Sequence, residues 1–158
     1  MIFSSKSEKE TFGFGQKFSK DFKGGEIIGL VGDLGAGKTV FVRGLATGLG
    51  ITKKITSPTF VFMKIYPVKQ FRLRRNSRSA GLNRENPVRR RAIKELVHID
   101  AYRITRAADM DGIGVKEYFN RPDTIVVIEW ADKIKKILPK RTKFFSFKIN
   151  ASGRQIKF

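Results

Sequence analysis

The sequence predicts an α/β fold, in which helices cover both faces of a mixed, mainly parallel central sheet. Three observations lead to this prediction. A glycine-rich turn joins an apolar run at residues 26–32 to a helical pattern at residues 39–50. Two more apolar runs, at residues 95–100 and 125–129, each end in an acid and are typical of buried strands. Helical or turn-rich segments lie between these runs, as a layered sandwich requires.

The elements of the N-terminal half follow from residue spacing and from capping residues. Residues 7–22 predict a helix, because four phenylalanines recur there at roughly helical spacing: Phe12, Phe14, Phe18 and Phe22. Ser7 followed by Glu10 is a capping-box pattern at its start. Residues 26–32 then predict a buried strand. The following helix, at residues 39–50, carries a single apolar stripe: Phe41, Leu45 and Leu49.

The C-terminal half alternates strands with short helical segments. Residues 56–66 predict a strand after Pro58, because they are rich in β-branched and aromatic side chains. Residues 107–120 are helical or turn-rich, and residues 131–138 predict a short amphipathic helix. The chain ends with a predicted hairpin of two strands, at residues 143–149 and 154–158.

The composition favours one domain, residues 1–158, which is long enough to bury a core. The chain has no cysteine, and this excludes disulfides, thiolate zinc sites and a cysteine nucleophile. No stretch approaches the roughly 20 apolar residues of a membrane helix, and the first residues lack a signal-peptide pattern. We therefore expect a cytoplasmic protein that makes no contact with a membrane.

The formal net charge of +19 is not evenly spread along the chain. Residues 67–95 contain ten Lys or Arg and two acids, with little periodicity, and they predict a basic loop insertion within the domain. Such a charge favours contact with nucleic acid. A lysine-rich proteome together with one solvated basic loop explains the same charge, so the composition leaves both explanations open.

Residues 32–39, GDLGAGKT, match the phosphate-binding pattern G-x-x-x-x-G-K-[ST] at every fixed position. Glycines allow the backbone to fold around a phosphate, so that successive N–H groups point inward. The following helix adds the positive end of its dipole. Lys38 is expected to reach the β- and γ-phosphates, and the Thr39 hydroxyl to coordinate Mg²⁺. The fold prediction therefore becomes a P-loop NTPase-like three-layer sandwich.

A P-loop also needs an acid at the end of a neighbouring buried strand, and two strands offer one. Glu129 has the clearer context, because four apolar residues precede it. Asp100 is the second candidate, either for holding a metal-bound water or for orienting the attacking water. His98 lies two residues earlier on the same strand face, where we expect it to be a hydrogen-bond partner of Asp100. Alternatively, His98 and Asp100 are only a satisfied strand-end histidine and a capping aspartate.

These motifs together resemble the TsaE family. The segments that carry the resemblance occur in the family's order: GDLGAGKT, FVRGL, TSPTF, HIDAYR, EYF and VIEW. The resemblance covers about residues 5–158, apart from the insertion. It implies an ATPase that supports threonylcarbamoyladenosine modification of tRNAs reading ANN codons. The implied partners are homologues of TsaD and TsaB, and the implied cofactors are ATP and Mg²⁺. With such a substrate, the basic insertion becomes a candidate for tRNA contact.

The resemblance also assigns roles to individual residues. ATP would be held by Thr11, Gly32, Asp33, Leu34, Gly35, Ala36, Gly37, Lys38, Thr39, Val40 and Arg154. The metal ligands would be Thr39 and Glu129, and the catalytic residues Lys38, Glu129 and Asp100. A switch beside the γ-phosphate would comprise His98, Asp100, Tyr102 and Arg103.

Two other functions compete with this one. A small P-loop kinase of a metabolite or nucleotide would use the basic insertion as an arginine-bearing lid. An RNA-binding module with a vestigial ATPase site would explain the charge, but it would leave the intact P-loop unexplained. No N-K-x-D motif is present to read guanine, so ATP is the expected nucleotide.

Overall fold

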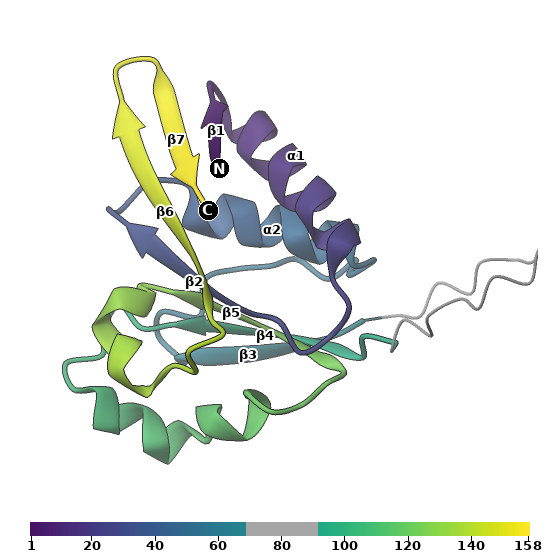
Figure 1. The fold of residues 1–158 in the computed structure, drawn as a ribbon, viewed down its shortest axis with the longest axis vertical. Helices are drawn as coiled ribbons and strands as arrows, with labels where there is room; N and C mark the ends of the chain where they lie inside the picture. The colour runs from purple at the N-terminus through teal and green to yellow at the C-terminus, as the bar shows by residue number, and fades with distance from the viewer. Residues whose placement is uncertain (69–91) are drawn as a thin grey trace, which may run out of the picture.

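The computed structural model describes residues 1–68 and 92–158, which contain a single mixed sheet (Figure 1). The order of its seven strands is β1-β7-β6-β2-β5-β4-β3. Strands β6, β2, β5 and β4 run parallel in the centre, and antiparallel pairings flank them on both sides. The strands are β1 (Ile2–Ser5), β2 (Ile27–Gly32), β3 (Met63–Pro67), β4 (Glu95–Asp100), β5 (Thr124–Glu129), β6 (Lys143–Asn150) and β7 (Gly153–Lys157). The predicted α/β class and mixed sheet are confirmed.

Helices lie on both faces of the sheet (Figure 1). One face carries α1 (Glu8–Phe18) and α2 (Lys38–Gly48), which pack closely because Gly15 faces Phe41 and Gly44 faces Phe12 without a side chain between them. The described 3-10 segments are η1 (Ser19–Asp21), η2 (Ala107–Ile113), η3 (Val115–Tyr118) and η4 (Ala131–Ile137). In the part of the chain that the structure describes, no helix is long and apolar enough to cross a bilayer.

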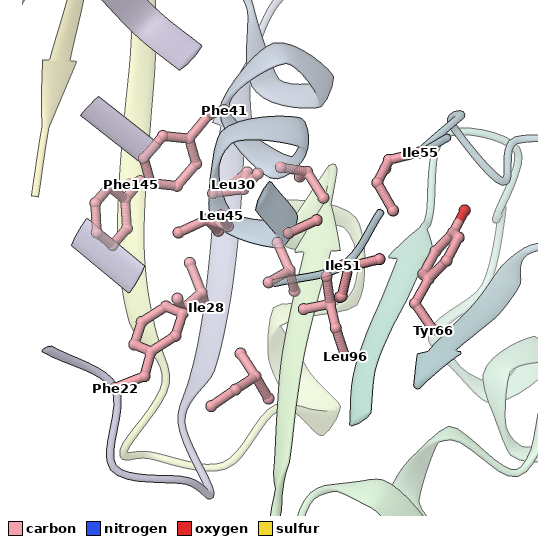
Figure 2. Close-up of a cluster of buried hydrophobic side chains, with 14 of the residues drawn as sticks. Phe22, Ile28, Leu30, Phe41, Leu45, Ile51, Ile55, Tyr66, Leu96 and Phe145 are labelled. Carbon is pink, nitrogen blue, oxygen red and sulfur yellow. The ribbon is translucent and has the colours of Figure 1, made fainter. Parts of the chain in front are cut away.

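The core is divided into two layers by the alternating side chains of the central strands. Ile125 and Val127 of β5 join the layer beneath α2, whereas Val126 and Ile128 join the layer beneath the 3-10 segments. Figure 2 shows the first layer, in which Phe41 of α2 faces the sheet. These strands are therefore buried on both sides, as their continuous apolar runs predict.

Several local predictions are confirmed. The Glu10 amide donates to Ser7 Oγ over 3.2 Å, so Ser7 caps α1 as its sequence pattern indicates. The reciprocal bond differs from the usual capping box, because the Glu10 carboxylate accepts from the Lys6 amide. The predicted C-terminal hairpin is present as β6 and β7.

Three parts of the sequence behave differently from the prediction. The strand expected after Pro58 begins only at Met63, because Phe62 has a left-handed backbone (φ 60°) and interrupts the extended chain. Strand β1 was not predicted; its four residues become a strand only by pairing with β7 at the other end of the chain. Residues 131–137 form 3-10 turns with a kink at Ile134 instead of one amphipathic helix.

The predicted basic insertion lies almost entirely outside the described residues. Its two described ends meet, because the Val68 amide donates to the Lys94 carbonyl over 2.7 Å. They flank the start of β4, whose other end is Asp100. At about 3.3 Å per residue, the insertion leaves the sheet roughly 16 Å from Asp100.

Candidate nucleotide-binding site

Three parallel strands deliver the predicted site residues to one edge of the sheet. Strand β2 runs into the predicted P-loop, residues 32–39, while β4 and β5 end at Asp100 and Glu129. Asp100 and Glu129 are register partners, so their Cα atoms lie side by side on neighbouring strands. The C-terminal edge of parallel strands is where open α/β sheets bind ligands.

The P-loop folds back over this edge and forms one wall of a cleft of about 290 Å³. Gly37 caps α2 with a left-handed backbone (φ 97°), and a Cβ there would lie 3.2 Å from Cδ of Arg154. The left-handed backbone favours glycine at this position, and any side chain there would also press against Arg154. The cleft is lined by Glu8, Leu34, Gly35, Ala36, Gly37, Lys38, Thr39, Val40, Ser57, Thr59, Asp100, Tyr102, Glu129 and Trp130.

Lys38 is held inside the P-loop. Its Nζ donates to the carbonyls of Gly32 (2.5 Å) and Asp33 (2.8 Å), and it lies 3.8 Å from the ring centre of Trp130. Burial lowers the pKa of Lys38 below the usual 10.5, and the nearby carboxylates of Glu129 and Asp100 oppose this shift. The ammonium therefore has little solvation of its own and is placed to exchange these contacts for anionic oxygens.

Glu129 joins the P-loop helix to strand β4. The Thr39 hydroxyl lies 2.9 and 2.8 Å from its two carboxylate oxygens, and His98 Nε2 lies 2.8 Å from Oε1. Because a carboxylate only accepts, Nε2 carries the proton and donates. Both side chains are almost wholly buried. The expectation that His98 pairs with Asp100 is therefore wrong: its hydrogen-bond partner lies across the sheet, on the neighbouring strand.

Asp100 has a different set of partners. Its Oδ2 accepts from Ser57 Oγ (2.5 Å) and Thr59 Oγ1 (2.6 Å), and its Oδ1 accepts from the Tyr102 amide (2.8 Å). Asp100 thus ties the loop before β3 to the loop after β4. Both oxygens are occupied by protein donors, and in this structure Asp100 therefore holds the two loops together.

Trp130 and Phe62 flank the two carboxylates with unusual backbones. Trp130 (φ 59°) and Phe62 (φ 60°) are the non-glycine residues with positive φ among the described residues. The Phe62 carbonyl accepts from the Asp100 amide, and the Trp130 ring lies 5.0 Å from the Tyr102 ring. Strained backbones of this kind are over-represented at functional sites.

The remaining predicted residues surround the cleft at different distances. The Thr11 hydroxyl bonds Ser5 at 2.8 Å, and Thr11 packs near Gly37 beside Arg154. Arg154 Nε is buried without a hydrogen-bond partner in the described residues. The Arg103 guanidinium instead lies 5.3 Å from the ring of Phe60, outside the residues that line the cleft.

The sequence interpretation gave no site role to four cleft residues: Glu8, Ser57, Thr59 and Trp130. The SPT segment was recognised as a motif, but no role followed from it, because nothing in the sequence shows that its hydroxyls meet Asp100. Glu8 is the first residue of a helix, where an acid is ordinary.

The donor set suits magnesium. A threonine hydroxyl and one carboxylate are hard oxygen ligands, and Mg²⁺ in phosphate-handling enzymes usually takes one or two such ligands together with substrate phosphates and waters. Within residues 1–68 and 92–158 there is no group of three His, Cys, Asp or Glu that would hold a metal unaided. Thr39 and Glu129 would supply two of the six ligands of Mg²⁺ and leave the others to phosphates or waters.

Comparison with known proteins decides the family. The model of the family described as threonylcarbamoyl adenosine biosynthesis protein TsaE matches residues 5–156. The chain belongs to the TsaE family. Two relatives named tRNA threonylcarbamoyladenosine biosynthesis protein TsaE come from Borreliella burgdorferi and Treponema pallidum. The first is 33% identical over 99% of this chain and 98% of its own length, and the second 32% identical over 96% and 93%.

The fold agrees with this assignment. The crystal structure of Bacillus subtilis YdiB superposes with a TM-score of 0.68 and 27% identity, over 99% of this chain and 82% of that one. A TsaE relative from Bacillus subtilis is 34% identical over 74% of this chain and 58% of its own length.

Proposed function

We propose that this TsaE-family protein is a Mg²⁺-dependent ATPase that supports threonylcarbamoyladenosine modification of tRNA. One observation carries the proposal: the Thr39 hydroxyl, at the start of α2, lies within hydrogen-bond distance of both oxygens of Glu129. Those are the two side chains that a P-loop uses to hold Mg²⁺. Their contact across 90 residues of sequence supports a working site rather than a glycine turn before a helix.

ATP is expected to bind along the P-loop, with its phosphates against the amides of residues 33–39. Lys38 would leave the carbonyls of Gly32 and Asp33 for the β- and γ-phosphates, which neutralise its charge better than two carbonyl dipoles. Thr39 and Glu129 would hold Mg²⁺, which neutralises charge on the phosphate oxygens when bound. Arg154, whose Nε has no partner among the described residues, would add a further cation beside Gly37.

Asp100 and its hydroxyl partners would act as the switch. A γ-phosphate in the cleft would compete with Asp100 for the hydroxyls of Ser57 and Thr59, both of which line it. Movement of either loop would also move the exposed Phe60, Val61 and Tyr102. We propose that homologues of TsaD and TsaB read this change and that ATP turnover resets their assembly.

A P-loop kinase is less well supported. Its lid would have to come from the basic insertion, whose described ends flank the start of β4 and contribute no residue to the cleft. A vestigial ATPase site is also disfavoured, because Lys38, Thr39 and Glu129 are all present. Thr39 contacts Glu129, and Lys38 lies beside the neighbouring Trp130.

The direct test is Lys38→Ala. We expect a folded protein without measurable ATP hydrolysis, because the lost ammonium is the one aimed at the phosphates. Phosphate release would be measured beside Lys53→Ala, an exposed lysine outside the cleft, with circular dichroism to check folding. Wild-type hydrolysis by folded Lys38→Ala would refute the ATPase assignment. Co-purification with TsaD and TsaB homologues, with and without ATP, tests the partners separately.

A further inference from the structure

The side of the sheet formed by β1, β7 and β6 has one covered face and one open face. Phe145, Phe147 and Ile156 point toward α1 and α2 and are buried. Side chains of the opposite parity point the other way, and there Lys148 and Lys157 are exposed. The strand register aligns this open face, because Lys157 lies opposite Ser146 and Gln155 lies opposite Lys148.

The open face is strongly basic. Residues 130–158, which supply this face, contain nine Lys or Arg and one acid, Asp132. Not all of these cations lie on the face, because Arg154 shares the parity of Ile156 and points the other way. Lys148 and Lys157 come from the strands, and Lys135 of η4 reaches the same face, with its Nζ 5.6 Å from the ring centre of Phe144. The sequence interpretation attributed the unusual charge to the insertion and overlooked this second concentration of lysines.

A groove of about 380 Å³ runs along this face. Phe144, Ser146 and Lys157 line it from the strands, and Asp132 and Lys135 line it from η4. Phe144 is partly exposed and has a lysine beside its ring. An aromatic ring with one lysine ammonium near it and further lysines on the same face is a combination by which proteins bind single-stranded nucleic acids. The ring stacks with a base, and the lysines neutralise the adjacent phosphates.

We propose that this face, the basic sheet face defined by Lys135, Phe144, Ser146, Lys148 and Lys157, binds a single-stranded segment of RNA. The hydroxyl of Ser146 and the amide of Gln155 offer hydrogen bonds to sugars or base edges. An acidic peptide would also satisfy the lysines, whereas a nucleic acid base can in addition stack on the aromatic ring. The inference goes beyond the proposed ATPase function, since the face shares no residue with the nucleotide cleft.

The test uses the full chain and a fluorescently labelled, unstructured 12-nucleotide RNA. Anisotropy at several salt concentrations would give the affinity and its salt dependence for wild type and for Lys135→Gln/Lys148→Gln/Lys157→Gln. We expect at least about tenfold weaker binding at moderate salt. The slope of log K against log[salt] should fall by about 2, at roughly 0.7 per phosphate contact on a single strand.

Two further variants distinguish RNA recognition by this face from non-specific electrostatic attraction. Lys9→Gln/Lys17→Gln/Lys53→Gln removes the same charge from exposed positions elsewhere, and it should leave most of the affinity and slope intact. Phe144→Leu keeps an apolar side chain but removes the stacking surface, and it should weaken binding about tenfold with an unchanged slope. Thermal unfolding would confirm that both variants are folded.

Equal losses of RNA affinity in the two triple-lysine variants would overturn the proposal, because binding would then depend on the total charge and not on the position of the lysines. So would an unchanged affinity in Phe144→Leu together with equal binding of an acidic peptide or of anionic vesicles. ATP hydrolysis would be measured on every variant. A wild-type protein that binds RNA through this face but does not hydrolyse ATP would refute the proposed function and leave this inference standing.

Discussion

Glu129 and Asp100 occupy matching positions yet have different partners. Each ends a parallel strand, the two are register partners, and they are 3% and 2% exposed. Glu129 bonds the P-loop helix through Thr39 and strand β4 through His98. Asp100 bonds two loops through Ser57, Thr59 and the Tyr102 amide.

The difference shows that a strand-end acid acquires its role from what faces it. Glu129 faces rigid elements, and its carboxylate is fixed where a metal ligand would be needed. Asp100 faces loops, and its carboxylate determines whether those loops stay together. The two acids should therefore differ in which measurable step they affect.

The largest effect is expected from Glu129→Gln. The amide preserves size but removes the charge, so ATP should still bind while hydrolysis slows at least about 100-fold, the scale of losing a charge-stabilising group. Nucleotide binding can be followed through Trp130, the single tryptophan of the chain, which lines the cleft. A nearly silent Glu129→Gln beside a severely impaired Asp100→Asn would mean that the two roles are reversed.

His98 should act through Glu129, as a positioning residue. We expect His98→Leu to raise the Mg²⁺ concentration for half-maximal hydrolysis about tenfold, since losing the partner of a metal ligand typically weakens metal use 10- to 100-fold. His98→Gln retains a donor and should recover much of the loss. If both variants lower maximal activity equally at saturating Mg²⁺, the role of His98 is only structural.

A smaller effect is expected from Asp100→Asn. The side chain keeps its shape, but one accepting oxygen becomes an NH2 group, which donates. If the remaining oxygen still accepts from the Tyr102 amide, the hydroxyls of Ser57 and Thr59 must turn to accept, at a cost of about 1 kcal/mol or about fivefold in hydrolysis. Its Mg²⁺ dependence should remain that of the wild type, in contrast to His98→Leu. A changed Mg²⁺ dependence in Asp100→Asn would place Asp100 at the metal and remove the contrast between the acids.

The smallest effect is expected on the pH dependence of stability, through Lys38. The carboxylates of Glu129 and Asp100 both influence the pKa of this lysine. Because its pKa is lowered in the folded protein, the unfolded chain binds more protons, and stability contributed at this site rises as pH climbs from the lowered pKa toward 10.5. The stability advantage of Lys38→Met over wild type should therefore shrink across that window. Urea unfolding at several pH values measures it, and an advantage that grows with pH would contradict the expectation.

The same measurement sharpens the comparison of the acids. Glu129 raises the pKa of Lys38 more than Asp100 does, although burial outweighs both. In a Glu129→Gln background the window should begin at a lower pH than in Asp100→Asn. An equal shift in both backgrounds would mean that the two carboxylates affect the ammonium alike.

The sequence by itself determined the features that depend on neighbouring residues. The P-loop, the cap of α1 by Ser7, the apolar stripe of α2 and the C-terminal hairpin all follow from residues within about ten positions of one another. Glu129 was also predictable as a strand-end acid, because its strand is one uninterrupted apolar run.

Only the tertiary structure decided which side chains and strands are in contact across the sheet. The partner of His98 is 31 residues away and those of Asp100 are 41 and 43 residues away, so spacing carried no signal for either. Strand β1 exists because it pairs with β7 at the opposite end of the chain, and the lysines of η4, β6 and β7 share a face only through strand register. The chemistry of a side chain can be read from the sequence, whereas strand order and register determine which side chains share a site. Order and register are established only when the whole sheet forms.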